Sequence, residues 1–109
     1  MTGPRQELER IRDGGGPGAE HARVALTASP DRLRAAILAL AAGRGAGSST
    51  CPSDAARAVA DDWRPLLPRA RELARELARD GRVRITQGDR VLDPGGEWRG
   101  PIRIRSGST

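Results

Sequence analysis

Lysine, phenylalanine and tyrosine are absent from this 109-residue sequence, and cysteine and histidine each occur once. The single cysteine, Cys51, excludes an internal disulfide and a zinc site built from several cysteines, and it fits a reducing compartment. Two isolated tryptophans, Trp63 and Trp98, do not make the aromatic platform on which proteins stack single-stranded bases. The core is therefore expected to be aliphatic and held together without disulfides or metal.

Long apolar runs are also missing. No segment approaches the roughly 18 to 20 apolar residues of a membrane span. The polar N-terminal residues 1–13 lack the apolar middle of a signal peptide. These absences predict a cytoplasmic protein that does not contact a membrane.

The groups that nucleophilic catalysis needs are not found together. Cys51 stands at an expected helix start, where a thiol pKa falls, but no base accompanies it and a small capping residue is the simpler interpretation. The only histidine, His21, falls in a segment expected to be flexible. The glycine-rich residues 43–47 lack the lysine of a phosphate-binding loop. We therefore expect no enzymatic activity, cofactor or metal site.

Positive charge is present in excess and unevenly distributed. All 19 basic residues are arginine, and the formal net charge is +5. The first 63 residues hold eight arginines and eight acids, whereas the remaining residues hold eleven arginines and six acids. An arginine-rich, alanine-rich genome would also raise the total, so the distribution is more informative than the sum. It predicts an anionic partner for the second half of the chain.

Composition divides the chain into three parts. Residues 1–28 contain the run Gly14-Gly15-Gly16-Pro17-Gly18 between charged stretches, which predicts a flexible extension with at most a weak helix over residues 6–12. Residues 29–105 are expected to fold as one domain, and residues 106–109 as a flexible tail.

Helix signals recur three times within the expected domain. Ser29 and Pro30 suit a helix cap and first turn, Pro52 and Pro65 mark two further starts, and Gly81 suits a helix end. The apolar spacing Leu33, Ile37 and Leu40 gives the first helix one buried face, and Leu66, Ala70, Leu73 and Leu77 give the third helix another. The predicted helices cover residues 30–43 and 52–60, and the third, introduced by residues 61–65 and starting no later than Leu66, runs to Asp80.

After Gly81 the apolar period changes from helical to alternating. Val83 and Ile85 alternate with polar residues, and the turn residues Gln87-Gly88-Asp89 are followed by strands expected over residues 90–92 and 102–105. Three helices followed by an antiparallel ribbon give an α+β domain, mainly helical, with the element order of a winged helix.

Five short segments carry a resemblance to a known family, in the same order along the chain. They are Cys51-Pro52-Ser53-Asp54-Ala55-Ala56-Arg57, Asp62-Trp63-Arg64-Pro65-Leu66-Leu67-Pro68, Asp80-Gly81-Arg82-Val83, Thr86-Gln87-Gly88 and Arg99-Gly100-Pro101-Ile102-Arg103. Through these segments the sequence resembles the bacterial family of domains of unknown function 3253. The resemblance covers about residues 31–105 and departs from the family at Asp54, where glutamate is commoner, and over residues 95–98. It implies a winged-helix-like fold and carries no catalytic residues.

Two groups of arginines are candidates for binding double-stranded DNA. One group forms a ridge on the third helix, the element that enters the major groove in a helix-turn-helix protein. The other lies on the ribbon, or wing, where arginines can follow a phosphate backbone or enter a minor groove. The candidates are Arg64, Arg71, Arg75, Arg79, Arg82, Arg84, Arg90, Arg103 and Arg105.

Each group has a simpler interpretation. The helix arginines can form ion pairs with neighbouring acids, expected as Glu72 with Arg75 and Glu76 with Arg79, and the wing arginines can keep a half-buried sheet soluble. Trp63 is expected in the core, and Trp98 as a partly exposed plug or contact. The alternative function is a protein-interaction or homodimerisation module on the same scaffold.

Overall fold

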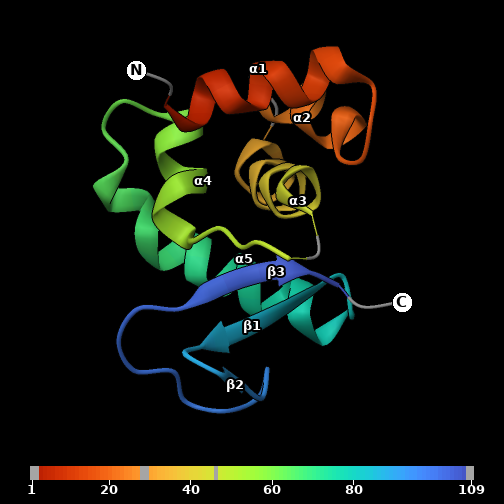
Figure 1. Cartoon of the computed structure of the whole chain (residues 1–109). Coiled ribbons are helices and arrows are strands. Elements are labelled where there is room, and N and C mark those ends of the chain that lie inside the picture. Colours follow the sequence, from red (N-terminus) through yellow and green to blue (C-terminus); the bar gives the residue numbers. More distant parts are fainter. Residues whose placement is uncertain (1–2, 28–29, 46, 108–109) are drawn as a thin grey trace.

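The structure is a computed structural model that describes residues 3–27, 30–45 and 47–107. These residues form five α-helices, one short 3-10 helix and three strands (Figure 1). The helices are α1 (Pro4–Gly14), α2 (Ala19–Ala25), α3 (Arg32–Arg44), α4 (Pro52–Val59), η1 (Arg64–Leu66) and α5 (Leu67–Arg79). The strands are β1 (Val83–Gln87), β2 (Arg90–Val91) and β3 (Arg103–Ser106).

The central element is α3. It lies between α1 and α2 on one side and the sheet on the other (Figure 1). Its residues from Ala35 to Ala41 are all buried, so the expected single apolar face is too narrow. Alanine at four of these positions makes the helix slender enough for neighbours to approach from every side. The expected cap Ser29 lies outside the described residues.

The N-terminal segment is folded, which corrects the expectation of a flexible extension for residues 3–27. Leu8 of α1 and Ala22 of α2 are fully buried against the rest of the core. Close approach is possible because Gly43 has no side chain, and a Cβ there would lie 2.5 Å from Ile11 Cδ1. This packing could not be predicted from apolar periodicity, because alanine and glycine contribute to burial without forming an apolar stripe.

The next two helices follow their predicted signals. Pro52 occupies the first turn of α4, and Pro65 lies in η1, which leads directly into α5. The missing amide hydrogens of both prolines cost nothing there, because helices begin with unpaired amides. Ala70, Leu73 and Leu77 are buried on one face of α5, as the spacing predicts, and Ala74 joins them, whereas the predicted member Leu66 lies in η1 and is only partly buried.

The sheet is antiparallel with strand order β2, β1, β3. Thr50 extends it beyond β3, because its backbone exchanges hydrogen bonds of 2.8 and 2.7 Å with Ile104. Val83, Ile85 and Ile104 are buried on the inner face, which packs against α3 and α5.

The C-terminal boundary also differs from expectation. Ser106 belongs to β3, and the Gly107 amide donates to the Arg82 carbonyl oxygen at 3.1 Å. A Cβ at Gly107 would lie 2.6 Å from the Gly81 carbonyl oxygen, so only glycine fits this approach. The expected tail from residue 106 is wrong for Ser106 and Gly107, and residues 108–109 lie outside the described part of the chain.

The α+β class, mainly helical with a small antiparallel sheet, is confirmed. Within the described ranges, no helix has both the length and the apolar character needed to cross a bilayer.

Candidate nucleic-acid interface

The outer face of the sheet carries a cluster of arginines. In the register of β1 and β3, Arg84 lies directly opposite Arg105, and Thr86 lies opposite Arg103. Side chains of directly paired residues point to the same face of an antiparallel sheet, and so do residues two apart on one strand. These four side chains therefore share the face that is turned away from Ile85 and Ile104. We call it the outer face.

Two outer-face arginines bind the backbone that precedes α4. Arg103 donates from Nε to Ser49 Oγ at 2.8 Å and from Nη2 to the Ser49 carbonyl oxygen at 3.0 Å. Arg105 makes one long hydrogen bond of 3.4 Å to the Ser48 carbonyl oxygen. Neither forms an ion pair with a carboxylate of the described residues, so both retain their full positive charge on this face.

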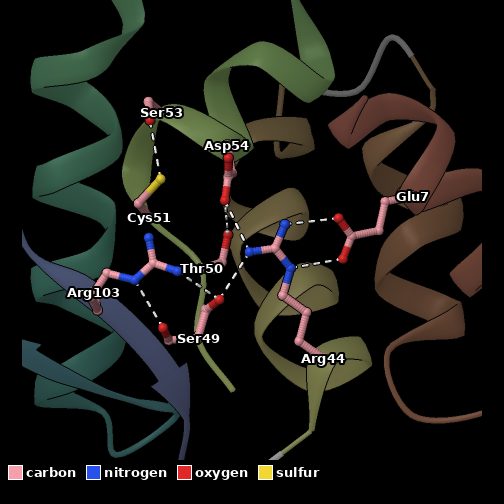
Figure 2. A network of polar contacts seen from close by, with 8 residues as sticks. All are labelled: Glu7, Arg44, Ser49, Thr50, Cys51, Ser53, Asp54 and Arg103. Carbon is pink, nitrogen blue, oxygen red and sulfur yellow. Dashed lines mark hydrogen bonds and ion pairs between the residues drawn. The ribbon is translucent and has the colours of Figure 1, made fainter. Parts of the chain in front are cut away.

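A polar network lies behind this edge of the sheet (Figure 2). Arg44 Nη1 donates to Asp54 Oδ2 at 3.0 Å and to the Ser49 carbonyl oxygen at 2.9 Å. Glu7 binds the other side of the same guanidinium, and Thr50 donates its hydroxyl to Asp54 at 3.0 Å. The Ser49 carbonyl thus accepts from Arg44 and Arg103, which connects α3 to β3.

Electrostatics within the network favour the charged forms. Hydrogen bonding to Glu7 raises the pKa of Arg44 above its already high ordinary value. Burial alone would raise the pKa of Asp54, but the Thr50 hydrogen bond and the charge of Arg44 outweigh it and leave that pKa lowered. The network is therefore an ionised support for the strand edge, with each charge compensated internally.

Two helix arginines are used to hold the wing loop, residues 92–102. Arg75 donates from Nη1 to the carbonyl oxygens of Pro94 and Gly96 at 2.6 and 2.7 Å. Its guanidinium also stacks on the Trp98 ring, 4.0 Å from the centroid. Arg71 donates to the carbonyl oxygens of Trp98 and Gly100 at 3.1 and 3.2 Å. This part of the expected recognition ridge is therefore covered by the chain's own loop.

The expected ion pairs on α5 are wrong. Arg69 binds both acids, Glu72 at 3.0 Å and Glu76 at 3.2 Å, and Arg75 binds carbonyl oxygens instead. An arginine three positions before an acid reaches it as readily as one three positions after it, so spacing alone did not exclude the pair Arg69–Glu72, and the contact of Arg69 with Glu76 spans seven positions. Arg79 is exposed and has no partner among the described residues.

The remaining candidates are dispersed. Arg64 is exposed and lies over the Trp63 ring, 4.7 Å from its centroid. Trp63 itself is partly buried against the core. Arg82 is exposed just before β1, and Arg90 pairs with Gln87 at the hairpin end of the sheet, outside the cluster of Arg84, Arg103 and Arg105.

Trp98 is a partly buried plug, as one of its two predicted roles required. Its indole Nε1 donates to the Asp93 carbonyl oxygen at 2.9 Å, and Arg75 covers one ring face. Gln87 holds the end of the same loop by donating to the Arg99 and Pro101 carbonyl oxygens at 2.5 and 3.0 Å. Sequence reasoning missed Gln87, Arg44 and Thr86 as site residues because their partners are backbone groups or distant strands.

The described ranges contain no cluster of three or more histidine, cysteine, aspartate or glutamate side chains that could hold a metal ion. Cys51 Sγ lies 3.1 Å from Ser53 Oγ and is only partly exposed. A groove of about 580 Å³ lies between the start of α3, the end of α4 and α5, away from the outer face.

Fold and site together define a small α+β domain with a basic outer sheet face and a wing loop held by helix arginines. A family model described as a protein of unknown function (DUF3253) matches residues 30–107, and the chain belongs to this family. The match runs from the residues before α3 to the end of the sheet, and α1 and α2 lie outside it. A comparison with curated proteins finds no match.

Proposed function

We propose that the protein binds double-stranded DNA through its phosphate backbone, using the outer face and the wing. The observation that carries this proposal is the direct pairing of Arg84 with Arg105 across β1 and β3. Like charges in directly opposite positions destabilise a sheet. A polyanion bound to this face would attract both guanidinium groups and so offset the repulsion between them.

The proposal also gains support from the absence of neutralising acids. None of the ion pairs of the described residues involves Arg82, Arg84, Arg90, Arg103 or Arg105. Internal acids instead bind Arg44 and Arg69, which lie elsewhere. The sheet and its hairpin end therefore present five arginines whose charge no carboxylate of the described residues neutralises, and a duplex backbone could contact them there.

Helix α5 has a smaller part in this proposal. Arg71 and Arg75 donate hydrogen bonds to the wing loop. Of the other arginines of the predicted ridge, Arg79 is exposed at the end of α5, and Arg64 is exposed in η1 just before α5. A winged helix that reads bases through its third helix needs that ridge uncovered. The order α3, Thr50, α4, α5, β1, β3 fits a winged helix, and we propose that this one relies on the sheet and wing for contact with DNA.

A protein partner is less well supported. Among the described residues, Val91 is the only large hydrophobic residue that is exposed, at 64%. Protein interfaces concentrate apolar and aromatic side chains in a central patch. The outer face offers charge instead, which matches a nucleic acid better than a second copy of this chain.

Fluorescence anisotropy with a labelled duplex at several salt concentrations tests the proposal. Four or five phosphate contacts predict a log-log slope of roughly −4. The double variant Arg84→Met/Arg105→Met should bind more weakly and lower the magnitude of this slope by about two. Arg10→Met, which removes an exposed arginine of α1 at the opposite end of the molecule, is the control and should behave like the original chain.

Two results would overturn the proposal. One is a lack of duplex binding by micromolar protein at low salt. The other is an equal loss of affinity in Arg10→Met and in the sheet variant, because it would show a general charge effect with no defined face.

A further inference from the structure

Two polar groups on the outer face are shielded from solvent without a hydrogen-bond partner. They are Nε of Arg84 and the hydroxyl Oγ1 of Thr86. Thr86 is only 6% exposed, and Arg84 is half-buried. The two residues are separated by one position on β1, so their side chains are neighbours on the same face.

Leaving such groups unpaired is costly. A buried donor without a partner costs about 1 to 3 kcal/mol, and more when it is charged. Native proteins pair nearly all buried polar groups, so an exception calls for an explanation, and a missing water or ion is one of them. Two exceptions side by side on one strand indicate a shared missing partner.

The chemistry around them defines that partner. A guanidinium has only donors, and a threonine hydroxyl can donate as well, so the partner must be rich in acceptors. Arg105 lies directly opposite Arg84, and its only hydrogen bond in the described chain is the long one to Ser48. The partner must therefore also carry negative charge, and it must be small enough to contact side chains of both strands from the outer face.

Arg103 has a different part in this arrangement. It lies opposite Thr86, but both of its hydrogen bonds go to Ser49, as Figure 2 shows. Its guanidinium is thereby fixed at the border of the face and adds positive potential there. On this face, Arg84 and Thr86 therefore have polar groups that the described chain leaves without a hydrogen-bond partner, and Arg105 has only its long bond to Ser48.

We propose that Arg84, Thr86 and Arg105 form a discrete site for one phosphate group on the outer face. This inference rests on the proposed function for the source of the ligand, a phosphodiester of the DNA backbone. The same three groups would also accept free inorganic phosphate, because guanidinium groups bind the oxygens of either species through charge-assisted hydrogen bonds.

Inorganic phosphate is a direct probe of this site. In ¹⁵N-labelled protein, the Nε–Hε resonance of Arg84 should shift saturably as phosphate is added. It should stay nearly still in chloride of matched ionic strength, since screening alone forms no hydrogen bond. Equal, unsaturated shifts in the two salts would overturn the site.

Thr86→Val supplies a matched variant of nearly the same shape. It removes the unpaired hydroxyl, so without phosphate it should fold at least as stably as the original chain. Its affinity for phosphate should fall about tenfold, as expected for one lost hydrogen bond to a charged ligand. Phosphate should therefore raise the melting temperature of the original chain more than that of Thr86→Val.

A second variant guards against a folding defect in the first. Arg84→Met should abolish the phosphate-dependent rise in melting temperature, whereas Arg10→Met should retain it. Retention of the full rise in both Arg84→Met and Thr86→Val would overturn the site.

Duplex titrations separate this inference from the proposed function. If the duplex binds with equal affinity to Thr86→Val and to the original chain, and phosphate fails to shift Arg84, the discrete site is wrong while DNA binding stands. If phosphate binds at Arg84 and the duplex does not bind, the site stands for a small phosphate ligand and the proposed function is wrong.

Discussion

Glu7 and Arg44 bind each other through two parallel hydrogen bonds, from Nε to Oε2 and from Nη2 to Oε1, each 2.8 Å long. The pair joins α1 to α3 across 37 positions of sequence. Arg44 also donates to Asp54 and to the Ser49 carbonyl oxygen, and Arg103 of β3 donates to the same carbonyl oxygen. Helix α1 is therefore connected to β3 through Arg44 and Ser49. The N-terminal helix is thus part of the support of the candidate interface.

Asp54 should make stability depend on pH. Its folded pKa is lowered, so it contributes stability above its ordinary value of 3.8, and that stability is lost as the pH falls through the folded pKa. Asp54→Asn should cost about 1 to 3 kcal/mol near pH 7, and the difference should shrink in acid. Urea unfolding followed by circular dichroism from neutral to acidic pH measures both.

The exposed Asp62 offers a control for this experiment. Asp62→Asn should change the unfolding free energy little near pH 7, because it alters an exposed side chain. A difference between Asp54→Asn and the original chain that stayed constant down to the lowest pH would contradict the assigned role of the Asp54 charge.

Leu8→Ala should destabilise the whole domain. Leu8 is fully buried in the common core, and cavity-forming substitutions of buried leucine cost about 2 to 5 kcal/mol. Gln6→Ala, on an exposed position of the same helix, should change stability little. Chemical denaturation of both variants measures this, and equal midpoints would show that α1 contributes nothing to the core.

His21 should titrate below its ordinary value of 6.5. Burial lowers the pKa of His21, the positive charges of Arg82 and Arg34 lower it further, and Glu20 opposes them in part. The folded state therefore binds a proton at His21 less readily than the unfolded chain does. The full stability of the fold is present above pH 6.5, and part of it is lost as the pH falls through the folded pKa of His21. Because it is the only histidine, its ring protons report this directly by NMR.

Arg82→Met should raise the pKa of His21, because it removes one of the nearby positive charges. Arg99→Met, in which the lost side chain is 91% exposed on the wing loop, serves as the control. An ordinary pKa for His21 in the original chain would mean that α2 is not docked as described.

Arg75→Met should release the wing loop without unfolding the domain. It removes two carbonyl hydrogen bonds and the stacking contact with Trp98 while keeping an apolar stem on α5. Amide hydrogen exchange over residues 94–100 should accelerate, with little change in the core strands. Arg79→Met, one turn further along α5, should leave the wing loop unchanged. Identical amide exchange rates of the loop in both variants would show that Arg75 does not hold it.

Much of the secondary structure could be predicted because its signals are local. Pro52 and Gly81 mark a helix start and a helix end, and the alternation of Val83 and Ile85 marks a strand. Helix α2 was missed, and α1 was expected at most as a weak helix over residues 6–12, since residues such as Ala22 and Ala25 are buried while giving almost no apolar periodicity. Their burial depends on Gly43 and on the slender α3, which are features of distant sequence.

The site was predictable only in part. Alternation correctly placed Arg84 and Arg105 on one face, because side-chain direction in a strand follows from position alone. The engagement of Arg71 and Arg75 was not predictable. Their acceptors are backbone carbonyl oxygens, which every residue has, and which of them lies within reach depends on the path of the wing loop.

The bridge between Thr50 and Ile104 also bears on the order of folding. It joins positions 54 residues apart. Closing so long a loop costs conformational entropy of the chain before the contacts at its ends can stabilise it. Helices built from neighbouring residues can form early, whereas this pairing has to wait for β3 to find the segment before α4. The outer face of the sheet is therefore expected to be among the last surfaces to form during folding, so a partly folded chain would lack it.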